Sequence, residues 1–155
     1  MINPIKKSLL ILVLAGANFH LSAQSNQLEY DADYQAVHTA ILDYVEGIYL
    51  VDSSRIARSV HPELRKRGYW FNAKEKAYRD NLDMTFQQLK DLAATWNKDG
   101  SNANNQTVKI IKIYDINDRT ATAKLTAAWG IDYFHLAKIE DKWMIMNVLW
   151  QSIKE

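Results

Sequence analysis

Three ionisable side chains in this sequence are the strongest candidates for acid–base chemistry: Asp132, His135 and His61. An imidazole exchanges a proton near neutral pH, and a carboxylate in an apolar site can act as a base. Asp132 and His135 lie three residues apart, so on a regular strand their side chains point to opposite faces of a sheet. We therefore expect no simple Asp–His pair, and a hydrogen-bonded structural role stays open for each histidine.

A second group of residues could line a pocket for a flat organic ligand, because such pockets are mostly aromatic with few polar groups. We expect ligand contacts from Tyr49, Tyr69, Trp70, Trp129, Asn147 and Trp150. Asn147 is the one polar residue in an apolar set on the last expected strand, which indicates a buried amide. Such an amide needs a hydrogen-bond partner, either a neighbouring backbone group or a ligand. The alternative for the aromatic residues is ordinary core.

We predict no metal and no cofactor. Four side chains could supply metal ligands, and their positions show no ligand spacing: His38, His61, His135 and Asp132. The chain has no cysteine, which excludes disulfides, thiol catalysis and Cys-ligated zinc.

Composition and charge narrow the class of protein. A chain of 155 residues makes one domain, and 48% apolar with 24% charged residues is typical of a packed globular protein. Wholesale disorder and a collagen-like fibre are excluded. The formal net charge is +1, from 19 Lys and Arg against 18 Asp and Glu, so no broad basic field attracts nucleic acid.

Residues 1–23 have the pattern of a secretory signal peptide. Lys6 and Lys7 precede a nearly all-apolar run, residues 8–17, and the segment ends on the small residue Ala23. The run is too short for a membrane span, which needs about 20 apolar residues. We expect cleavage after Ala23, which leaves residues 24–155 as one exported domain, periplasmic or secreted, with no membrane contact. An uncleaved N-terminal anchor is the alternative.

The elements that must position these side chains begin with helices. Apolar residues recur at helical spacing over residues 34–50, and Asp31 or Asp33 could cap the start of that helix. Asp52 could cap a short second helix over residues 53–60.

The middle of the chain is less regular. Residues 64–71 read as a strand or an extended lid, and residues 72–82 as a turn or hairpin. Thr85 followed by Gln88 is a capping box that opens a third helix. Residues 97–106 contain a glycine and several asparagines, which predicts a loop.

From Thr107 onward the apolar pattern changes to a period of two, which predicts an antiparallel meander with short turns. The expected strands are residues 108–116, 119–129, 131–139 and 142–151. We expect tight turns at residues 117–118 and 140–141, and a bulge at Gly130. Because helices precede strands, the fold class is α+β.

Two of the expected strands indicate what the sheet faces. Ala121, Ala123, Leu125 and Ala127 alternate with polar residues, so these small side chains face inward and leave volume for a helix or a ligand to fill. The last strand is apolar on both faces, which favours helices against one face and a second subunit against the other.

Two blocks of sequence carry a family resemblance. The first is YVEGIY at residues 44–49 with Asp52 and VHPEL at 60–64; the second is DYFHLAKI at 132–139 with KWMIMNVLW at 142–150. They resemble the NTF2-like superfamily, and within it the putative lumazine-binding or SnoaL-like group, over roughly residues 33–152. The resemblance implies a strongly curved sheet around a long helix, forming an open cone. Ketosteroid isomerase, scytalone dehydratase, polyketide cyclases and non-catalytic binding domains share this fold.

The expected fold is therefore an NTF2-like α+β cone, with a curved antiparallel sheet of about four to six strands packed on about three helices. The expected function is binding of a small, mostly apolar organic ligand in the cone by an exported homodimer. The resemblance leaves open an isomerase, dehydratase or cyclase of the SnoaL or ketosteroid isomerase type, with Asp132 or a histidine as acid–base and Tyr49 or Tyr69 as donors. A dimeric interaction module with a filled cone is the third possibility.

Overall fold

The structure, a computed structural model, describes the backbone of residues 4–154 and the side chains of residues 27–154. It divides into two units, residues up to Asp33 and residues from Tyr34 onward. The predicted signal peptide, residues 1–23, lies outside the residues whose side chains are described. No helix among the described residues combines the length and apolar character that a membrane crossing requires.

The first helix is longer than the sequence predicts. It is α1 (Pro4–Tyr49), so Asp31 and Asp33 lie inside the helix and the prediction that one of them caps its start is wrong. No Pro or Gly interrupts the sequence between residues 24 and 46, so nothing there ends a helix. The apolar stripe predicted from Tyr34 onward is confirmed as core by its burial: Val37, Ala40, Ile41, Tyr44, Val45 and Ile48.

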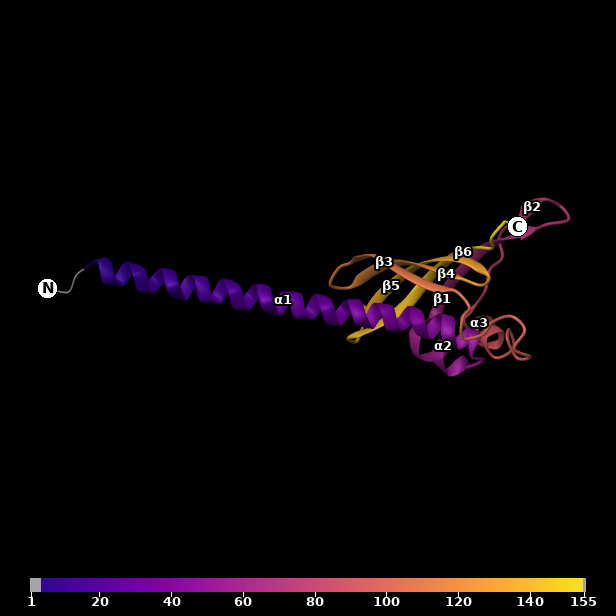
Figure 1. The fold of residues 1–155 in the computed structure, drawn as a ribbon, viewed down its shortest axis with the longest axis horizontal. Helices are drawn as coiled ribbons and strands as arrows, with labels where there is room; N and C mark the ends of the chain where they lie inside the picture. The colour runs from indigo at the N-terminus through magenta and orange to yellow at the C-terminus, as the bar shows by residue number, and fades with distance from the viewer. Residues whose placement is uncertain (1–3, 155) are drawn as a thin grey trace. The chain divides into compact units, whose positions relative to one another are not determined.

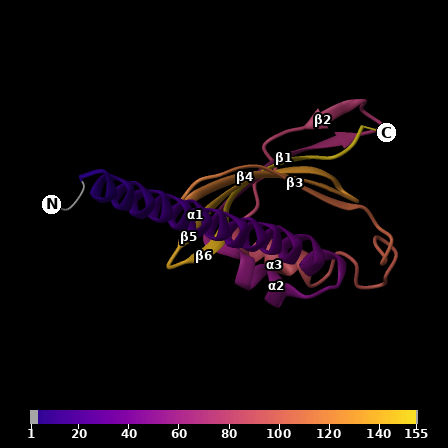
Figure 2. The ribbon, with the colours of Figure 1, turned by 60° about the vertical axis from the view of Figure 1, so that its left-hand side comes forward.

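Two short helices follow, and local signals define both. In α2 (Ser53–Ser59), the carboxylate of Asp52 accepts a hydrogen bond of 3.0 Å from the backbone N–H of Ser54, which confirms the predicted N-cap. In α3 (Phe86–Ala93), Thr85 and Gln88 form the predicted capping box. Both helices and the C-terminal end of α1 lie on one side of the sheet (Figures 1 and 2).

Residues 60–151 supply one six-stranded sheet with the strand order β2-β1-β6-β5-β4-β3. Its strands are β1 (Val60–Asn72), β2 (Ala77–Arg79), β3 (Lys109–Ile116), β4 (Thr120–Ala127), β5 (Gly130–Ile139) and β6 (Lys142–Gln151). The sheet is curved and unclosed and arches over the helices, so the predicted α+β class is confirmed (Figure 2).

One strand pair departs from the expected antiparallel arrangement. β1 pairs with β6 in parallel, while the other neighbouring strands are antiparallel, so the sheet is mixed. Residues 64–71, which the sequence predicts as either a strand or an extended lid, therefore belong to β1, a strand of 13 residues. The predicted hairpin after it is confirmed, because β2 folds back antiparallel onto the end of β1.

The two turns that flank β5 have different backbones. Glu140 and Asp141, with φ of 47° and 61°, form the predicted tight turn between β5 and β6. The bulge predicted at Gly130 is wrong. Gly130 pairs with Ala127 across a two-residue turn and has a φ of 137°, so it begins β5 instead of bending a continuous strand.

The bulge lies in β6, and it reverses the faces of that strand. Asn147 pairs with His135 and Ile145 pairs with Leu136, so Met146 between them has no partner on β5 and forms the bulge. Ile145 is buried before the bulge and Val148 is buried after it. Asn147 is exposed, so the prediction that it is a buried amide is wrong. Leu149 is exposed on the same outer face.

Candidate functional site

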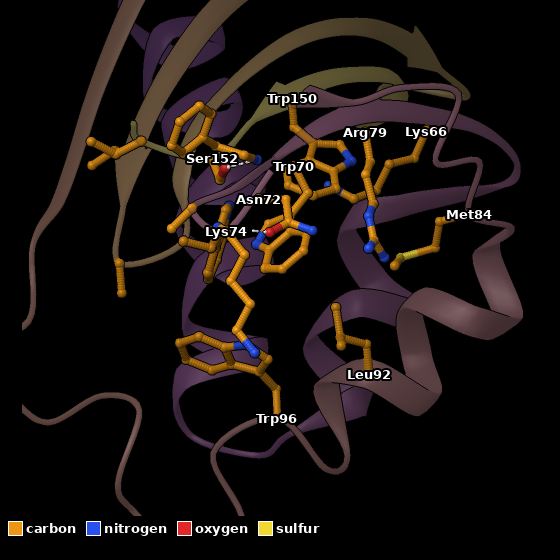
Figure 3. A pocket seen from close by; sticks show the side chains of 15 residues that line it. Lys66, Trp70, Asn72, Lys74, Arg79, Met84, Leu92, Trp96, Trp150 and Ser152 are labelled. Carbon is orange, nitrogen blue, oxygen red and sulfur yellow. Dashed lines mark hydrogen bonds between the residues drawn. The ribbon is translucent and has the colours of Figure 1, made fainter. Parts of the chain in front are cut away.

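A pocket of about 870 Å³ lies on the helix side of the sheet (Figure 3). It is lined by β1, the β1–β2 hairpin, α3 and the segment after it, the β4–β5 turn and the end of β6. Its volume falls within the range of roughly 300–1,000 Å³ typical of small-molecule sites. Because no side chain fills this volume, the structure disfavours the third possibility, a dimeric interaction module whose cone is filled.

The walls of this pocket are mainly aromatic, and we call it the aromatic pocket. Four of the five tryptophans of the chain line it together with Phe71: Trp70, Trp96, Trp129 and Trp150. Trp96 and Trp129 meet edge to face with ring centroids 5.6 Å apart. The inward-facing alanines of β4 are buried as predicted.

An ionic cluster is buried at the wall of the aromatic pocket. The Nζ of Lys66 donates a hydrogen bond of 2.8 Å to the hydroxyl of Tyr44 and lies 3.7 Å from Oδ1 of Asp132. The indole N–H of Trp129 donates to Oδ2 of Asp132 at 3.1 Å. The Lys66 ammonium also lies 5.2 Å from the centroid of the Trp150 ring. We call Lys66, Asp132 and Tyr44 the buried cluster.

Burial controls the protonation of this cluster. Desolvation raises the pKa of Asp132 and lowers the pKa of Lys66, and the attraction between the two charges opposes both shifts. Burial also raises the pKa of Tyr44 well above its usual value, so this phenol stays protonated. Lys66 and Asp132 together carry no net charge whichever of them holds the shared proton.

Only one member of the buried cluster reaches the aromatic pocket. Lys66 lines it, whereas Asp132 is fully buried behind Lys66 and Trp129, with no hydrogen bond to its Oδ1 from any described residue. Asp132 can therefore act on a ligand only through Lys66 or Trp129. Lys66 is the functional residue that sequence reasoning missed. The signal was its alternation with Leu64 and Gly68, which places a lysine on the inward face of β1.

The two predicted histidines lie outside the aromatic pocket. His135 is exposed on the sheet face opposite Asp132, as the spacing predicts. His61 stands at the start of β1, where its Nδ1 accepts a hydrogen bond of 3.2 Å from the backbone N–H of Glu63. The side chains described by the structure contain no group of three or more potential metal ligands.

The structure separates the six predicted ligand contacts. Trp70, Trp129 and Trp150 line the aromatic pocket. Tyr49 does not line it but packs against Trp96 and Trp129. The Tyr49 hydroxyl donates a hydrogen bond of 2.7 Å to the carbonyl of Val108 and accepts one of 2.7 Å from the N–H of Ala128. Two contacts lie elsewhere, since Tyr69 is 38% exposed and does not line it, and Asn147 lines a second pocket of about 530 Å³.

Comparison with known proteins identifies the relatives of this architecture. The family model described as putative lumazine-binding matches residues 32–151. No curated protein matches the chain in sequence. An NTF2-like protein of unknown function from Silicibacter pomeroyi DSS-3 is 14% identical, with a TM-score of 0.59 over 80% of this chain and 98% of the other.

Two further solved structures share the fold. An NTF2-like protein with a cystatin-like fold from Novosphingobium aromaticivorans is 10% identical, with a TM-score of 0.61 over 86% of this chain and 90% of the other. A type 2 hexachlorocyclohexane dehydrochlorinase is 11% identical, with a TM-score of 0.50 over 83% and 90%. At such identities the similarity is one of fold alone.

Proposed function

Since this chain belongs to the putative lumazine-binding family, we propose that it is a binding protein for a small, flat, mostly apolar organic molecule. The observation that carries the proposal is the aromatic pocket, whose volume of about 870 Å³ is bounded by four tryptophans. Flat rings stack against indole faces, and the single buried cation at the wall supplies a polar contact that fixes orientation.

The proposal predicts that Trp70 contributes to binding of a flat aromatic probe. Trp70 lines the aromatic pocket and is 45% exposed, so its removal costs little stability. We expect Trp70→Ala to weaken binding of 2-naphthol about tenfold, because loss of one stacked ring costs about 1 kcal/mol or slightly more. Isothermal titration calorimetry measures the dissociation constant.

Tyr114→Ala is the matched control. Tyr114 is an aromatic residue of similar exposure, 50%, but it lies on β3 and does not line the aromatic pocket. Its removal should leave the dissociation constant unchanged. Equal loss of affinity in both variants, or no binding to the wild-type chain, would overturn the proposed binding function.

We also propose export, on the strength of the signal-peptide pattern in residues 1–23. Intact mass measurement of the chain recovered from a bacterial periplasm or medium tests this. The expected mature chain begins at Gln24. A chain that keeps Lys6 and Lys7 and sediments with the membrane would instead show an uncleaved anchor.

The outer face of the sheet is the proposed dimer interface. Tyr133 and Leu149 pair directly across β5 and β6, and they are 47% and 51% exposed. Exposed neighbouring apolar side chains of this size favour association. We expect light scattering to give twice the chain mass for the wild type and the single-chain mass for Leu149→Lys. Leu50→Lys, which changes a leucine of similar exposure, 57%, directly after α1, should stay dimeric. A wild-type monomer would contradict this interface.

The buried cluster favours a second candidate function, proton transfer to or from a bound molecule. Titratable groups whose pKa values are shifted by burial and by a specific charged partner, beside a pocket, are candidates for acid–base chemistry, and Lys66 and Asp132 are such a pair. In this role Lys66 exchanges the proton with the ligand, and Asp132 holds Lys66 in place. In conditions where urea unfolding shows the variant to be folded, Asp132→Asn should then abolish turnover while binding changes little. Turnover that survives in both Asp132→Asn and Lys66→Met would exclude this role.

A further inference from the structure

The charged side chains that line the aromatic pocket are all of one sign. Lys66, Lys74 and Arg79 contribute to its lining, and none of the described lining residues is an Asp or Glu. These cations come from β1, the β1–β2 turn and β2, so they approach the pocket along one hairpin (Figure 3). A ligand in this pocket therefore meets hydrogen-bond donors and positive charge.

Lys66 has donor capacity that its protein partners do not use. An ammonium has three N–H donors. One goes to the hydroxyl of Tyr44 at 2.8 Å, and a second faces Oδ1 of Asp132 at 3.7 Å. The third has no hydrogen-bond acceptor among the described residues, and Lys66 lines the aromatic pocket.

Among the described residues, neither of the other two cations forms a buried ion pair, and the guanidinium of Arg79 lies 5.7 Å from the centroid of the Trp70 ring. Figure 3 shows Lys74 extending toward Trp96 and Arg79 extending toward Met84. No described residue forms an ion pair with the ammonium of Lys74. Arg79 pairs with Glu75 at 3.1 Å, but both side chains of this pair are 56% exposed, so water screens their attraction.

The nearby carboxylates leave positive charge at the pocket surface. Asp132 neutralises Lys66, so this charge comes from Lys74 and Arg79, and Glu75, which pairs with Arg79, lies outside the lining. A negatively charged group entering the pocket approaches cations first. Charge-assisted hydrogen bonds to such a group are stronger than those to a neutral one.

From this arrangement we propose that the ligand is a flat aromatic anion, such as an aromatic carboxylate, whose ring lies among the tryptophans and whose charged group is bound by Lys74, Arg79 and Lys66. This inference rests on the proposed binding function and specifies its ligand class. The aromatic rings account for affinity toward any flat molecule, and the cations account for selection of an anion among them.

Two probes of nearly equal shape test the charge directly. 2-Naphthoate carries a carboxylate, and 2-naphthamide carries a neutral amide on the same ring. In isothermal titrations at low salt, we expect the full chain to bind 2-naphthoate about tenfold or more tightly than 2-naphthamide. The advantage should shrink as salt rises, because two of the three cations are exposed.

A charge-neutralising pair of substitutions locates the effect. Lys74→Gln with Arg79→Gln should weaken 2-naphthoate about tenfold and leave 2-naphthamide unchanged, since both side chains are exposed and neither supports the core. Lys112→Gln is the control, because Lys112 is an exposed lysine of β3 that does not line the aromatic pocket. It should change neither affinity.

The outcomes separate the two proposals. Tighter binding of 2-naphthoate that depends on Lys74 and Arg79 supports the anion. Equal affinity for both probes overturns the anion and leaves the binding function standing. Binding of neither probe at about millimolar concentration overturns both, because drug-sized flat molecules should enter an open aromatic pocket of this volume.

Discussion

Replacing Asp132 with Asn is expected to destabilise the folded protein by about 3–5 kcal/mol, because it leaves the ammonium of Lys66 buried without its counter-charge. Asn keeps the size of the side chain and an oxygen that can accept the N–H of Trp129. The change therefore removes the charge and little else. Urea unfolding followed by fluorescence or circular dichroism measures the free energy.

Lys66→Met is the complementary variant. The variant that carries both Asp132→Asn and Lys66→Met completes a double-mutant cycle. Met fills the space of the lysine stem but leaves the Asp132 carboxylate buried alone. Removing both charges together should cost much less than the sum of the two single changes, because neither charge is then left without a partner. Additive costs would show that Lys66 and Asp132 do not interact.

The two single variants should respond to pH in opposite directions. In Asp132→Asn, the pKa of Lys66 falls further below its unfolded value of about 10.4. At pH values between the folded and the unfolded pKa of Lys66, the unfolded chain binds more protons than the folded chain, so the free energy of unfolding rises with pH. In Lys66→Met, the raised pKa of Asp132 makes the folded chain bind more protons above about pH 4, so stability falls as pH rises through that folded pKa. The double variant should show neither slope, and identical slopes in both single variants would contradict the cluster.

The second large effect is expected at Gly130. A Cβ there would lie 2.1 Å from the carbonyl oxygen of Gln151, and the φ of 137° is one that other residues rarely adopt. The three nearest atoms all belong to the backbone of Gln151 and Ser152, so no side-chain rotation relieves the clash. We expect Gly130→Ala to cost about 3 kcal/mol or more, from the clash and the backbone strain together. The change also disturbs the turn that places Trp129 in the aromatic pocket.

Gly100→Ala separates the two parts of that cost. Gly100 also has a positive φ, 75°, but a Cβ there meets no atom within 4 Å. It should cost about 1 kcal/mol or slightly more, from strain alone. Thermal and urea unfolding of the two variants measure the difference. Equal costs would show that β6 can move away from Gly130.

Local signals in the sequence predict most of the elements. Asp52 and the Thr85–Gln88 box mark the starts of α2 and α3, since a side chain that caps a helix lies within three residues of its target. The alternation in β4 predicts its buried face in the same way. These features depend on neighbours along the chain, which the sequence contains directly.

The features that were missed depend on distant partners. The parallel pairing of β1 with β6 joins residues more than eighty positions apart, and no local pattern in β1 encodes it. The extra residue at Met146 arises from the register with β5, so it reversed the predicted orientation of Asn147. Lys66 was missed because a lysine on an inward face is explained only by a carboxylate on another strand, Asp132. Of the residues that line the aromatic pocket, the sequence predicts Trp70, Trp129 and Trp150 as ligand contacts, and it does not predict the cation Lys66.

The central claim is that the aromatic pocket holds a flat organic molecule. Crystals of the protein with 6-bromo-2-naphthol test it most directly, because bromine gives an anomalous signal that marks its own position. The account predicts a bromine peak enclosed by Trp70, Trp96, Trp129 and Trp150. A well-ordered pocket without that peak, or bromine found only on the outer face of the sheet, would contradict it.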